Sequence, residues 1–374
     1  MMLDNVFRED EKAIYKLREL YSNHGYNQYK VSKFEEYDLY ARNKSFLVSE
    51  NLLTFTDTNG KLMALKPDIT LSIIKNAVAD DKSSYKLYYD EHVYRTTSGG
   101  DGFREIMQTG LESIGAVDIF SESEVIMLAA KSLASISEDY LLDLSHMSFI
   151  EGMLENIGIE PQDMANTMTM MGSKNVPALR SFCDSKGISE SDREMICGLT
   201  SMYLPMEAAL EKIKPTVKGA KMSAAYEELC DIYKALKCYG ITDKIRLDLS
   251  IVNDMNYYDG VIFKGFINKI PDSILSGGRY DRLMEKFGKK TGAIGFAVYL
   301  DKLERFGNDS REYDIDVMLV YDNGVDPELV ISTVDSLMMS GKTVRAVSAP
   351  DGGVRCRQLM KLTKEGVDIL EGND

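Results

Sequence analysis

Residues 93–115 read VYRTTSGGDGFREIMQTGLESIG, the stretch with the clearest structural pattern in the chain. Apolar and polar residues alternate before Arg95 and after Phe103, on either side of a glycine-rich segment. The pattern predicts two antiparallel strands, at 85–95 and 103–114, joined by a flexible connection. Because side chains alternate between the two faces of a strand, one face of the second strand is expected to carry Arg104, Ile106, Gln108, Gly110 and Glu112.

That strand face has the features of a small binding site. Gly110 has no side chain, so a notch is predicted between the amide of Gln108 and the carboxylate of Glu112. A notch of this kind suits a small ligand that carries amino or imidazole donors. Taken alone, the same face is more simply explained as solvent-exposed, since charged strand faces are usually solvated.

Composition excludes several classes of protein. The 374 residues predict two or three domains, and a net charge of −15 disfavours binding to a nucleic-acid backbone. Five cysteines without CxxC spacing and three scattered histidines predict neither a disulfide framework nor a zinc site, so we expect no metal and no cofactor. The amino-terminal segment lacks the apolar core of a signal peptide, and no run reaches the length of a membrane span. A cytoplasmic protein that does not contact membranes is expected.

Periodicity divides the chain into an α+β core, a helical insertion and a small tail. The core is expected over 1–305, with the insertion at about 150–240, and a separate α/β domain over 313–374. Its first helix is expected over 4–24, and further strands at 62–66, 244–251 and 260–270. In the insertion, the methionine-rich piece ANTMTMMGSK is interpreted as core filler rather than as a cofactor surface. The tail is expected to alternate strand, helix, strand, helix and strand, with the second helix in VRCRQLMKLTKEG, 354–366.

Several motifs together resemble the histidyl type of class II aminoacyl-tRNA synthetases. Residues 93–115 are similar to motif 2 of that family, and LMALKPDIT, 62–70, is similar to the segment that holds the α-amino group of the amino acid. NYYDGVIF resembles the second histidine-specific motif, and LSGGRYDRLMEKFG followed by GAIGFAVYLDKL resembles the glycine-rich strand and motif 3. The resemblance covers residues 1–305. It implies a mixed, mainly antiparallel sheet flanked by helices, and a tail like a shortened anticodon-binding domain.

The positions that match the synthetase's ATP contacts have changed. Asn253 stands where the family has an arginine that contacts the α-phosphate, and Lys302 stands at the arginine of motif 3. Thr97 replaces a glutamate that reads adenine, and Lys33 lies near the place of the motif 1 proline. An amide cannot neutralise charge that develops on phosphorus, and lysine lacks the bidentate fork of arginine. Arg95 and Arg104 alone keep this side positive, as an anion site, so we expect adenylation and aminoacylation to be lost.

The amino-acid side of the pocket is kept. The positions that match histidine contacts in the family, and that we expect to form a histidine-like pocket, are Asp68, Thr70, Gln108, Glu112, Tyr257, Tyr258 and Tyr280. Asp68 is one methylene shorter than the glutamate of the synthetases. Carboxylates at Asp68 and Glu112 could pair with an ammonium and an imidazole, and the tyrosines could enclose a flat ring. A relic pocket that binds nothing is the alternative.

The whole pattern resembles the regulatory subunits of ATP phosphoribosyltransferase, which are synthetase paralogues. LKPDIT in particular looks like that family. The resemblance implies no catalytic residues, a short-form catalytic phosphoribosyltransferase as partner, L-histidine as effector, and a homodimer within a hetero-oligomer. Eleven acidic against six basic side chains over 313–374 disfavour an RNA-binding tail. An active histidyl-tRNA synthetase, and an enzyme that transfers histidine to another acceptor, are the competing hypotheses.

Overall fold

The computed structural model describes residues 7–43, 52–77, 85–96, 102–252, 257–304 and 313–372. The chain divides into two compact units, Glu9–Phe306 and a unit that joins Gly307–Asp374 with Met1–Arg8. Asn253 and Thr97, two of the changed ATP-side positions, lie outside the described residues.

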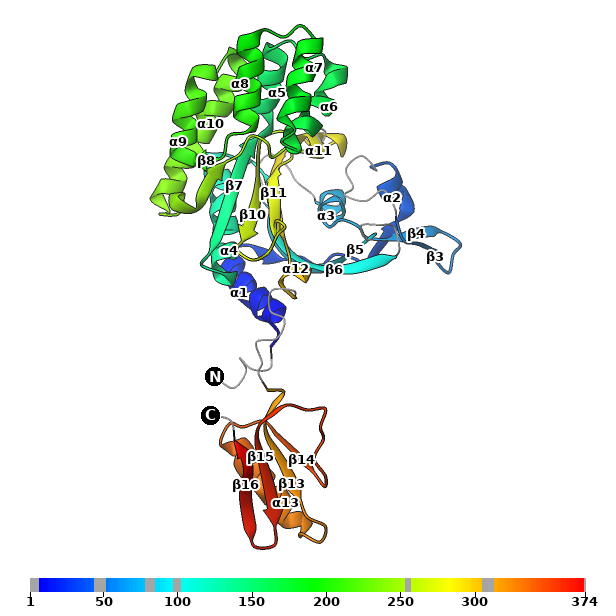
Figure 1. Cartoon of the computed structure of the whole chain (residues 1–374). Coiled ribbons are helices and arrows are strands. Elements are labelled where there is room, and N and C mark those ends of the chain that lie inside the picture. The colour runs from blue at the N-terminus through cyan, green and yellow to red at the C-terminus, as the bar shows by residue number, and fades with distance from the viewer. Residues whose placement is uncertain are drawn as a thin grey trace. The chain divides into compact units, whose positions relative to one another are not determined.

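A nine-stranded sheet forms the centre of the larger unit (Figure 1). Its strands, in spatial order, are β1 (Asn27–Gln28), β5 (Tyr85–Thr96), β6 (Phe103–Gly115), β12 (Gly292–Tyr299), β11 (Leu275–Arg279), β10 (Val261–Ile267), β7 (Tyr140–His146), β9 (Ile245–Leu247) and β8 (Leu204–Pro205). Within the described strands of this sheet, the β1/β5 and β7/β9 pairs are parallel and the other pairs are antiparallel. The predicted mixed, mainly antiparallel sheet is confirmed, and β5 pairs with β6 from Tyr85 opposite Ile114 to Thr96 opposite Phe103.

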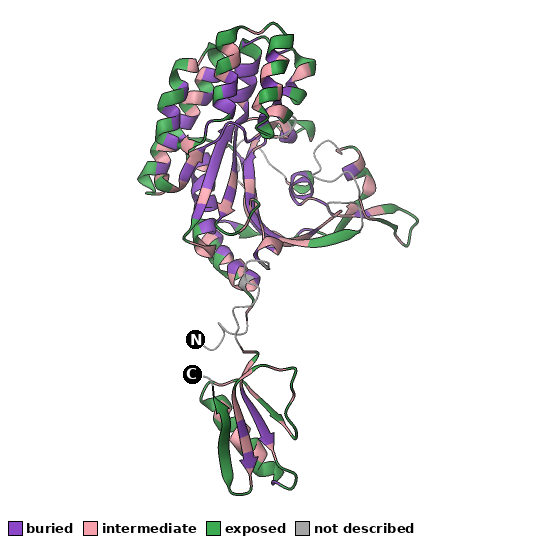
Figure 2. Ribbon diagram, viewed as in Figure 1, coloured by how far each residue is buried: buried purple, intermediate pink, exposed green. Residues whose placement is uncertain are grey.

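One face of this sheet packs against two long helices. Helix α1 (Glu9–Asn23) contributes Leu17 and Tyr21 to the main core, and α4 (Ile119–Ile136) is buried along most of its length. Asp118 caps α4, because its carboxylate accepts the backbone N–H of Ser121 at 2.9 Å. Figure 2 shows that burial is densest in the central strands β7, β10 and β11. The opposite face of the sheet is therefore the one available for a site.

Short elements surround that opposite face. They are α2 (Tyr37–Ala41), α3 (Thr70–Asn76), α11 (Asp281–Lys286) and a three-stranded sheet of β2 (Phe34–Glu36), β4 (Leu62–Leu65) and β3 (Thr54–Thr56). Helix α12 (Asp301–Glu304) instead contacts α1, and its Leu303 belongs to the main core. A second core cluster lies here, in which Leu71 and Ile73 of α3 pack with Tyr89 and Ile114 of the sheet. Because α3 begins at Thr70, two residues after Asp68, the chain brings both residues to the sheet surface.

The insertion is helical, as expected. Its helices are α5 (Met147–Asn156), α6 (Pro161–Gly172), α7 (Val176–Ser185), α8 (Glu190–Thr200), α9 (Met206–Ile213) and α10 (Gly219–Cys238), with 3₁₀ turns at Lys214–Thr216 and Thr242–Lys244. They gather at one end of the sheet in Figure 1. Met164, Met168 and Met171 of α6 are buried in the main core, which confirms the core interpretation. Among the described residues, no helix has the length and apolar character needed to cross a membrane.

The smaller unit contains a four-stranded sheet with one helix. Its elements are β13 (Ile315–Tyr321), α13 (Pro327–Met339), β14 (Val344–Val347), β15 (Cys356–Thr363) and β16 (Gly366–Gly372), in the strand order β14-β13-β15-β16. The predicted second helix at 354–366 is wrong, because this segment forms β15. Met360 and Leu362 alternate toward the core of this unit, and Gly366, at φ +145°, turns the chain directly into β16.

Candidate functional site

Two glycines make the floor of the site on the open face of the sheet. A Cβ on Gly295 would lie 1.8 Å from Glu112 Oε2, and a Cβ on Gly278 would lie 2.9 Å from Tyr258 Cδ1. Glu112 and Tyr258 therefore lie flat across strands β12 and β11. Glycine inside a strand marks close approach of another group, and this signal in the sequence, at SGG and GAIG, could have located the floor.

The predicted notch at Gly110 is filled. Tyr89 stands directly opposite Gly110 on β5, and a Cβ on Gly110 would lie 2.5 Å from the Tyr89 hydroxyl and 2.2 Å from the Phe296 carbonyl oxygen. The glycine thus makes room for a buried tyrosine of this chain. Tyr89 is a wall residue that the sequence pattern did not reveal.

Glu112 is the most buried charged group of the site. Its side chain is 1% exposed, and its carboxylate accepts hydrogen bonds from Thr70 Oγ1 at 2.8 Å and from the Tyr280 hydroxyl at 2.5 Å. Burial raises the pKa of Glu112 to about 8, although both hydrogen bonds oppose the shift; the charge of Asp68 adds to it. At neutral pH Glu112 therefore favours the protonated carboxyl group, and a positively charged group beside it would favour the carboxylate.

A pH-dependent stability difference follows for Glu112→Gln. The native pKa lies above the unfolded value, so the native state holds a proton that the unfolded chain has released, and stability falls as pH rises from about 4.5 to about 8. Glutamine does not titrate and keeps a neutral hydrogen-bonding group. We expect the two proteins to have the same free energy of unfolding in urea, without ligand, near pH 4.5. Toward pH 8 the free energy of unfolding of the variant should exceed that of the wild type by up to about 1.4 kcal/mol more for each pH unit. A constant difference between the two proteins would contradict the buried, protonated state.

Aromatic rings form one wall of the site. The ring centroids of Tyr257 and Tyr258 are 4.5 Å apart at an interplanar angle of 47°, and those of Tyr257 and Tyr280 are 6.0 Å apart at 56°. All three hydroxyl groups have a raised pKa because they are buried, so they stay protonated and can donate hydrogen bonds. A flat ring that carries polar edges fits such a wall.

Asp68 lies at the start of α3. Its Oδ1 accepts the backbone N–H of Leu71 at 2.9 Å, and its side chain keeps partial exposure. Burial raises the pKa of Asp68, while that hydrogen bond and the charge of Arg95 lower it. The carboxylate therefore accepts from a backbone amide and keeps further acceptor capacity for an ammonium group.

Gln108 lies on the same strand face as Glu112, four residues before it. The side chain is 2% exposed, and its Nε2 has no hydrogen-bond partner among the described residues. A buried amide donor without a partner is unfavourable unless water or a ligand satisfies it. Gln108 therefore offers a donor to an anionic or carbonyl group.

The candidate phosphate side is different in character. Arg95 donates through Nε to the Pro67 carbonyl at 2.8 Å, and Arg104, its direct cross-strand partner, is exposed. Lys302 Nζ donates to the Ser273 carbonyl at 2.7 Å and lies 5.3 Å from the centroid of the Tyr299 ring. Lys302 is thus engaged with the backbone of its own chain. Lys33, near the place of the motif 1 proline, is exposed.

The structure brings most of the expected pocket together. The residues linked by hydrogen bonds, ring contacts or mutual electrostatic influence are Asp68, Thr70, Glu112, Tyr257, Tyr258 and Tyr280. Arg95 borders them through Asp68. Within the described ranges, His, Cys, Asp and Glu side chains form no group of three or more suited to a metal ion.

Comparisons with known proteins show which families this chain is similar to. Residues 2–303 match the family model described as histidyl-tRNA synthetase. The ATP phosphoribosyltransferase regulatory subunit of Clostridium botulinum (strain Langeland) is 31% identical over 334 residues, which cover 86% of this chain and 79% of that protein. The protein of the same name from Caldanaerobacter subterraneus is 31% identical over 77% of this chain and 76% of its own length.

Two solved structures share the fold. A Bacillus halodurans structure described as an ATP phosphoribosyltransferase regulatory subunit/histidyl-tRNA synthetase has a TM-score of 0.76 at 23% identity and covers 95% of this chain and 94% of its own. A chain of the ATP phosphoribosyl transferase complex from Thermotoga maritima has a TM-score of 0.62 at 18% identity and covers 78% of this chain and 97% of its own. The class II synthetase-like fold is confirmed.

Proposed function

The chain belongs to the regulatory subunits of ATP phosphoribosyltransferase, within the histidyl-tRNA synthetase family, and we propose that it binds and activates a short-form catalytic phosphoribosyltransferase chain in the first step of histidine biosynthesis. It contributes no catalytic residue of its own. L-Histidine, the end product, binds the pocket described above and inhibits the assembly. The mechanism is linkage: the partner is activated because its active conformation is bound better, and histidine couples with the opposite sign.

One observation carries this proposal: a buried carboxyl group faces an aromatic wall, and two hydroxyl groups hold it in place. Glu112, fixed by Thr70 and Tyr280, suits a ring N–H of imidazole. Asp68 suits the α-amino group, and the unsatisfied amide of Gln108 suits the α-carboxylate. A ring N–H, the α-amino group and the α-carboxylate of histidine thus each have a partner of matching chemistry.

The opposite side of the pocket supports loss of adenylation. Lys302 is a point charge that a backbone carbonyl already occupies, so it does not reproduce a bidentate arginine. Asn253 adds no charge. Arg95 and Arg104 stand directly opposite each other on β5 and β6. Like charges in this position repel, and an anion bound between them would relieve the repulsion. We assign this pair to an anionic group, without a catalytic role.

Assembly as a homodimer within the hetero-oligomer is also proposed. The outer face of the small three-stranded sheet exposes Phe34 and Phe55, whose rings meet edge to face at a centroid distance of 5.5 Å. An exposed aromatic pair of this kind is typical of an interaction surface.

The cysteines bear on where the protein works. Five free cysteines, two of them buried, are consistent with a reducing cytoplasm.

The test combines the purified chain with the short catalytic subunit from the same source. We expect phosphoribosyl-ATP formation only in the mixture, and a fall in rate when L-histidine is added. Glu112→Gln should keep the activation and weaken the inhibition by histidine about tenfold, since a charged hydrogen bond is replaced by a neutral one. Glu194→Gln, which alters an exposed ion pair with Arg180, serves as the control.

Two outcomes would contradict the proposal. Histidine-dependent exchange of pyrophosphate into ATP by the chain alone would identify a synthetase instead. An inactive mixture, with both chains folded and associated, would exclude the activating role. If activation is seen but Glu112→Gln is inhibited as strongly as the wild type, histidine acts at another place on the assembly.

A further inference from the structure

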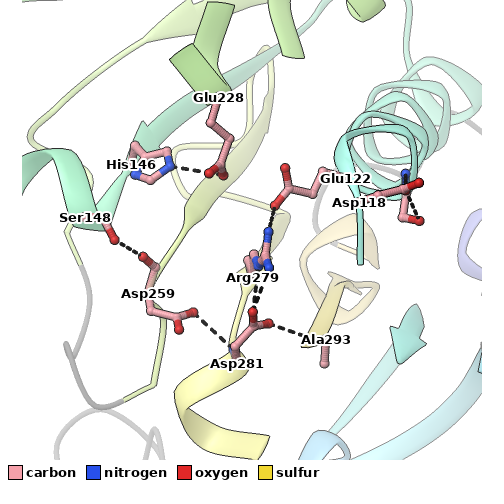
Figure 3. Close-up of polar contacts among 10 residues, drawn as sticks. Asp118, Glu122, His146, Ser148, Glu228, Asp259, Arg279, Asp281 and Ala293 are labelled. Atoms are coloured by element: carbon pink, nitrogen blue, oxygen red, sulfur yellow. Dashed lines mark hydrogen bonds and ion pairs between the residues drawn. The ribbon is translucent and has the colours of Figure 1, made fainter. Parts of the chain in front are cut away.

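Arg279 and Asp281, the neighbours of Tyr280 in the sequence, bind other elements of the larger unit (Figure 3). Arg279 Nη1 donates to Glu122 Oε1 of α4 at 2.6 Å, and its Nε and Nη2 donate to Asp281 Oδ2 at 2.9 and 2.8 Å. The other oxygen of Asp281 accepts the backbone N–H of Ala293 at 2.9 Å. The backbone on both sides of Tyr280 is thus fixed to α4 and to β12.

Asp259 joins the two chain segments that form the aromatic wall of the pocket, one with Tyr257 and Tyr258 and one with Tyr280. It follows Tyr258 directly, and its carboxylate oxygens accept the backbone N–H groups of Asp281 and Arg282 at 3.1 and 3.2 Å. Ser148, in the first turn of α5, donates its hydroxyl to the Asp259 carbonyl (Figure 3). A displacement of the segment with Tyr258 would therefore also displace the segment with Tyr280 and the start of α5.

Arg282 makes the strongest connection between pocket and insertion. Its Nη1 and Nη2 donate to Glu151 Oε1 and Oε2 of α5 at 2.7 and 2.8 Å, which is a bidentate pair. Lys221 of α10 binds the same carboxylate at 2.8 Å. Burial alone would raise the pKa of Glu151, but hydrogen bonds from Arg282 and Lys221 hold it below its usual value. A buried carboxylate that depends on Arg282 makes separation of α11 from α5 costly.

His146 completes the connection at the base of the insertion. Its Nδ1 accepts the backbone N–H of Phe149 at 3.3 Å, which caps α5, and its Nε2 lies 3.1 Å from Glu228 Oε1 of α10 (Figure 3). Since Nδ1 accepts, the ring proton of the neutral tautomer belongs on Nε2, facing Glu228. Glu122, which binds Arg279, is close enough to Glu228 for their charges to interact, so α10 and the pocket share one network.

We propose that Arg282 is a positioning residue through which pocket ligand and helical insertion stabilise each other: a ligand between Tyr258 and Tyr280 fixes α5 and α10 against the sheet. The inference rests on the proposed histidine site and adds the element that responds to it. The coupling is reciprocal. If histidine changes the affinity of the insertion for a partner by some factor, that partner changes the affinity of the pocket for histidine by the same factor.

The test measures L-histidine binding by calorimetry and amide hydrogen exchange of α5 and α10 in the full-length chain. In the wild type, histidine should slow exchange over 147–156 and 219–238. Arg282→Gln should bind histidine about tenfold more weakly, a coupling usual for residues in one network, and should lose that protection. Arg282→Lys keeps the charge but not the fork, and should recover part of both. Arg180→Gln removes an exposed arginine–glutamate pair within the insertion and should change neither.

The outcomes separate this inference from the histidine site itself. Arg282→Gln with wild-type affinity and wild-type protection would overturn the coupling and leave the site in place. If the wild type binds no histidine, both the proposed histidine site and the coupling through Arg282 are excluded. If Arg282→Gln does not fold, Arg282→Lys decides: reduced affinity with reduced protection supports the coupling, and wild-type values exclude it. A weaker affinity with unchanged protection would restrict Arg282 to the pocket and also overturn the coupling.

Discussion

Gly295→Ala is expected to unfold the site and abolish the response to histidine. The new Cβ would lie 1.8 Å from Glu112 Oε2 and 2.4 Å from the Leu111 carbonyl oxygen. The glutamate could rotate away, but only by leaving Thr70 and Tyr280. The carbonyl belongs to β6, which pairs directly with β12, so it cannot withdraw without breaking the ladder. We expect a loss of about 3 kcal/mol in the free energy of unfolding, at the upper end for overpacking.

The matched control is Gly198→Ala on α8. A Cβ at that position meets no heavy atom within 4 Å, and the residue is exposed inside a helix. Because glycine is a poor helix former, the free energy of unfolding of this variant should rise by up to about 1 kcal/mol. Urea unfolding and histidine calorimetry on both variants check the prediction. Gly295→Ala with wild-type stability and wild-type binding would show that the floor is not packed as described.

The sequence predicted the strand pair and its inward face because both depend on local periodicity. Alternation placed Gln108 and Glu112 on the same side, and the β5/β6 register bears this out. What fills the space beside Gly110 depends on the opposing strand, and the position of Tyr89 there required the register itself. A period-two pattern states which way a side chain points, but not which neighbour it meets.

In the tail, the local pattern predicted the wrong type of element. Residues 354–366 mix apolar and basic residues at spacings that also suit a helix, so the expectation of α/β alternation favoured one. Pairing with β13 on one side and β16 on the other made the segment a strand. The tie between Arg282 and Glu151 joins residues 131 positions apart, and no local pattern indicates such a pair. The roles of Asn253 and Thr97 stay predictions.

Lys66→Met is expected to produce a comparable loss of stability for an electrostatic reason. The lysine is fully buried, its Nζ lies 2.7 Å from Glu91 Oε2, and Glu91 is 17% exposed. Methionine fills a similar volume, so the main change is a largely buried carboxylate without its cation. Breaking such a pair costs about 3 kcal/mol. Because Lys66 precedes Pro67 and Asp68, histidine binding should weaken as well.

The double variant Lys66→Met/Glu91→Gln separates charge from packing. If the loss comes from the unpaired carboxylate, neutralising Glu91 should restore most of the stability, since an uncharged pair is often as stable as a buried ion pair. Glu91 Oε1 also accepts the backbone N–H of Val31 at 3.1 Å, and the amide oxygen of glutamine can keep that bond. Urea unfolding of the two single variants and the double variant gives the coupling energy. A double variant as unstable as Lys66→Met would mean that the lysine acts through its hydrogen bond to the Val31 carbonyl and its packing, not through Glu91.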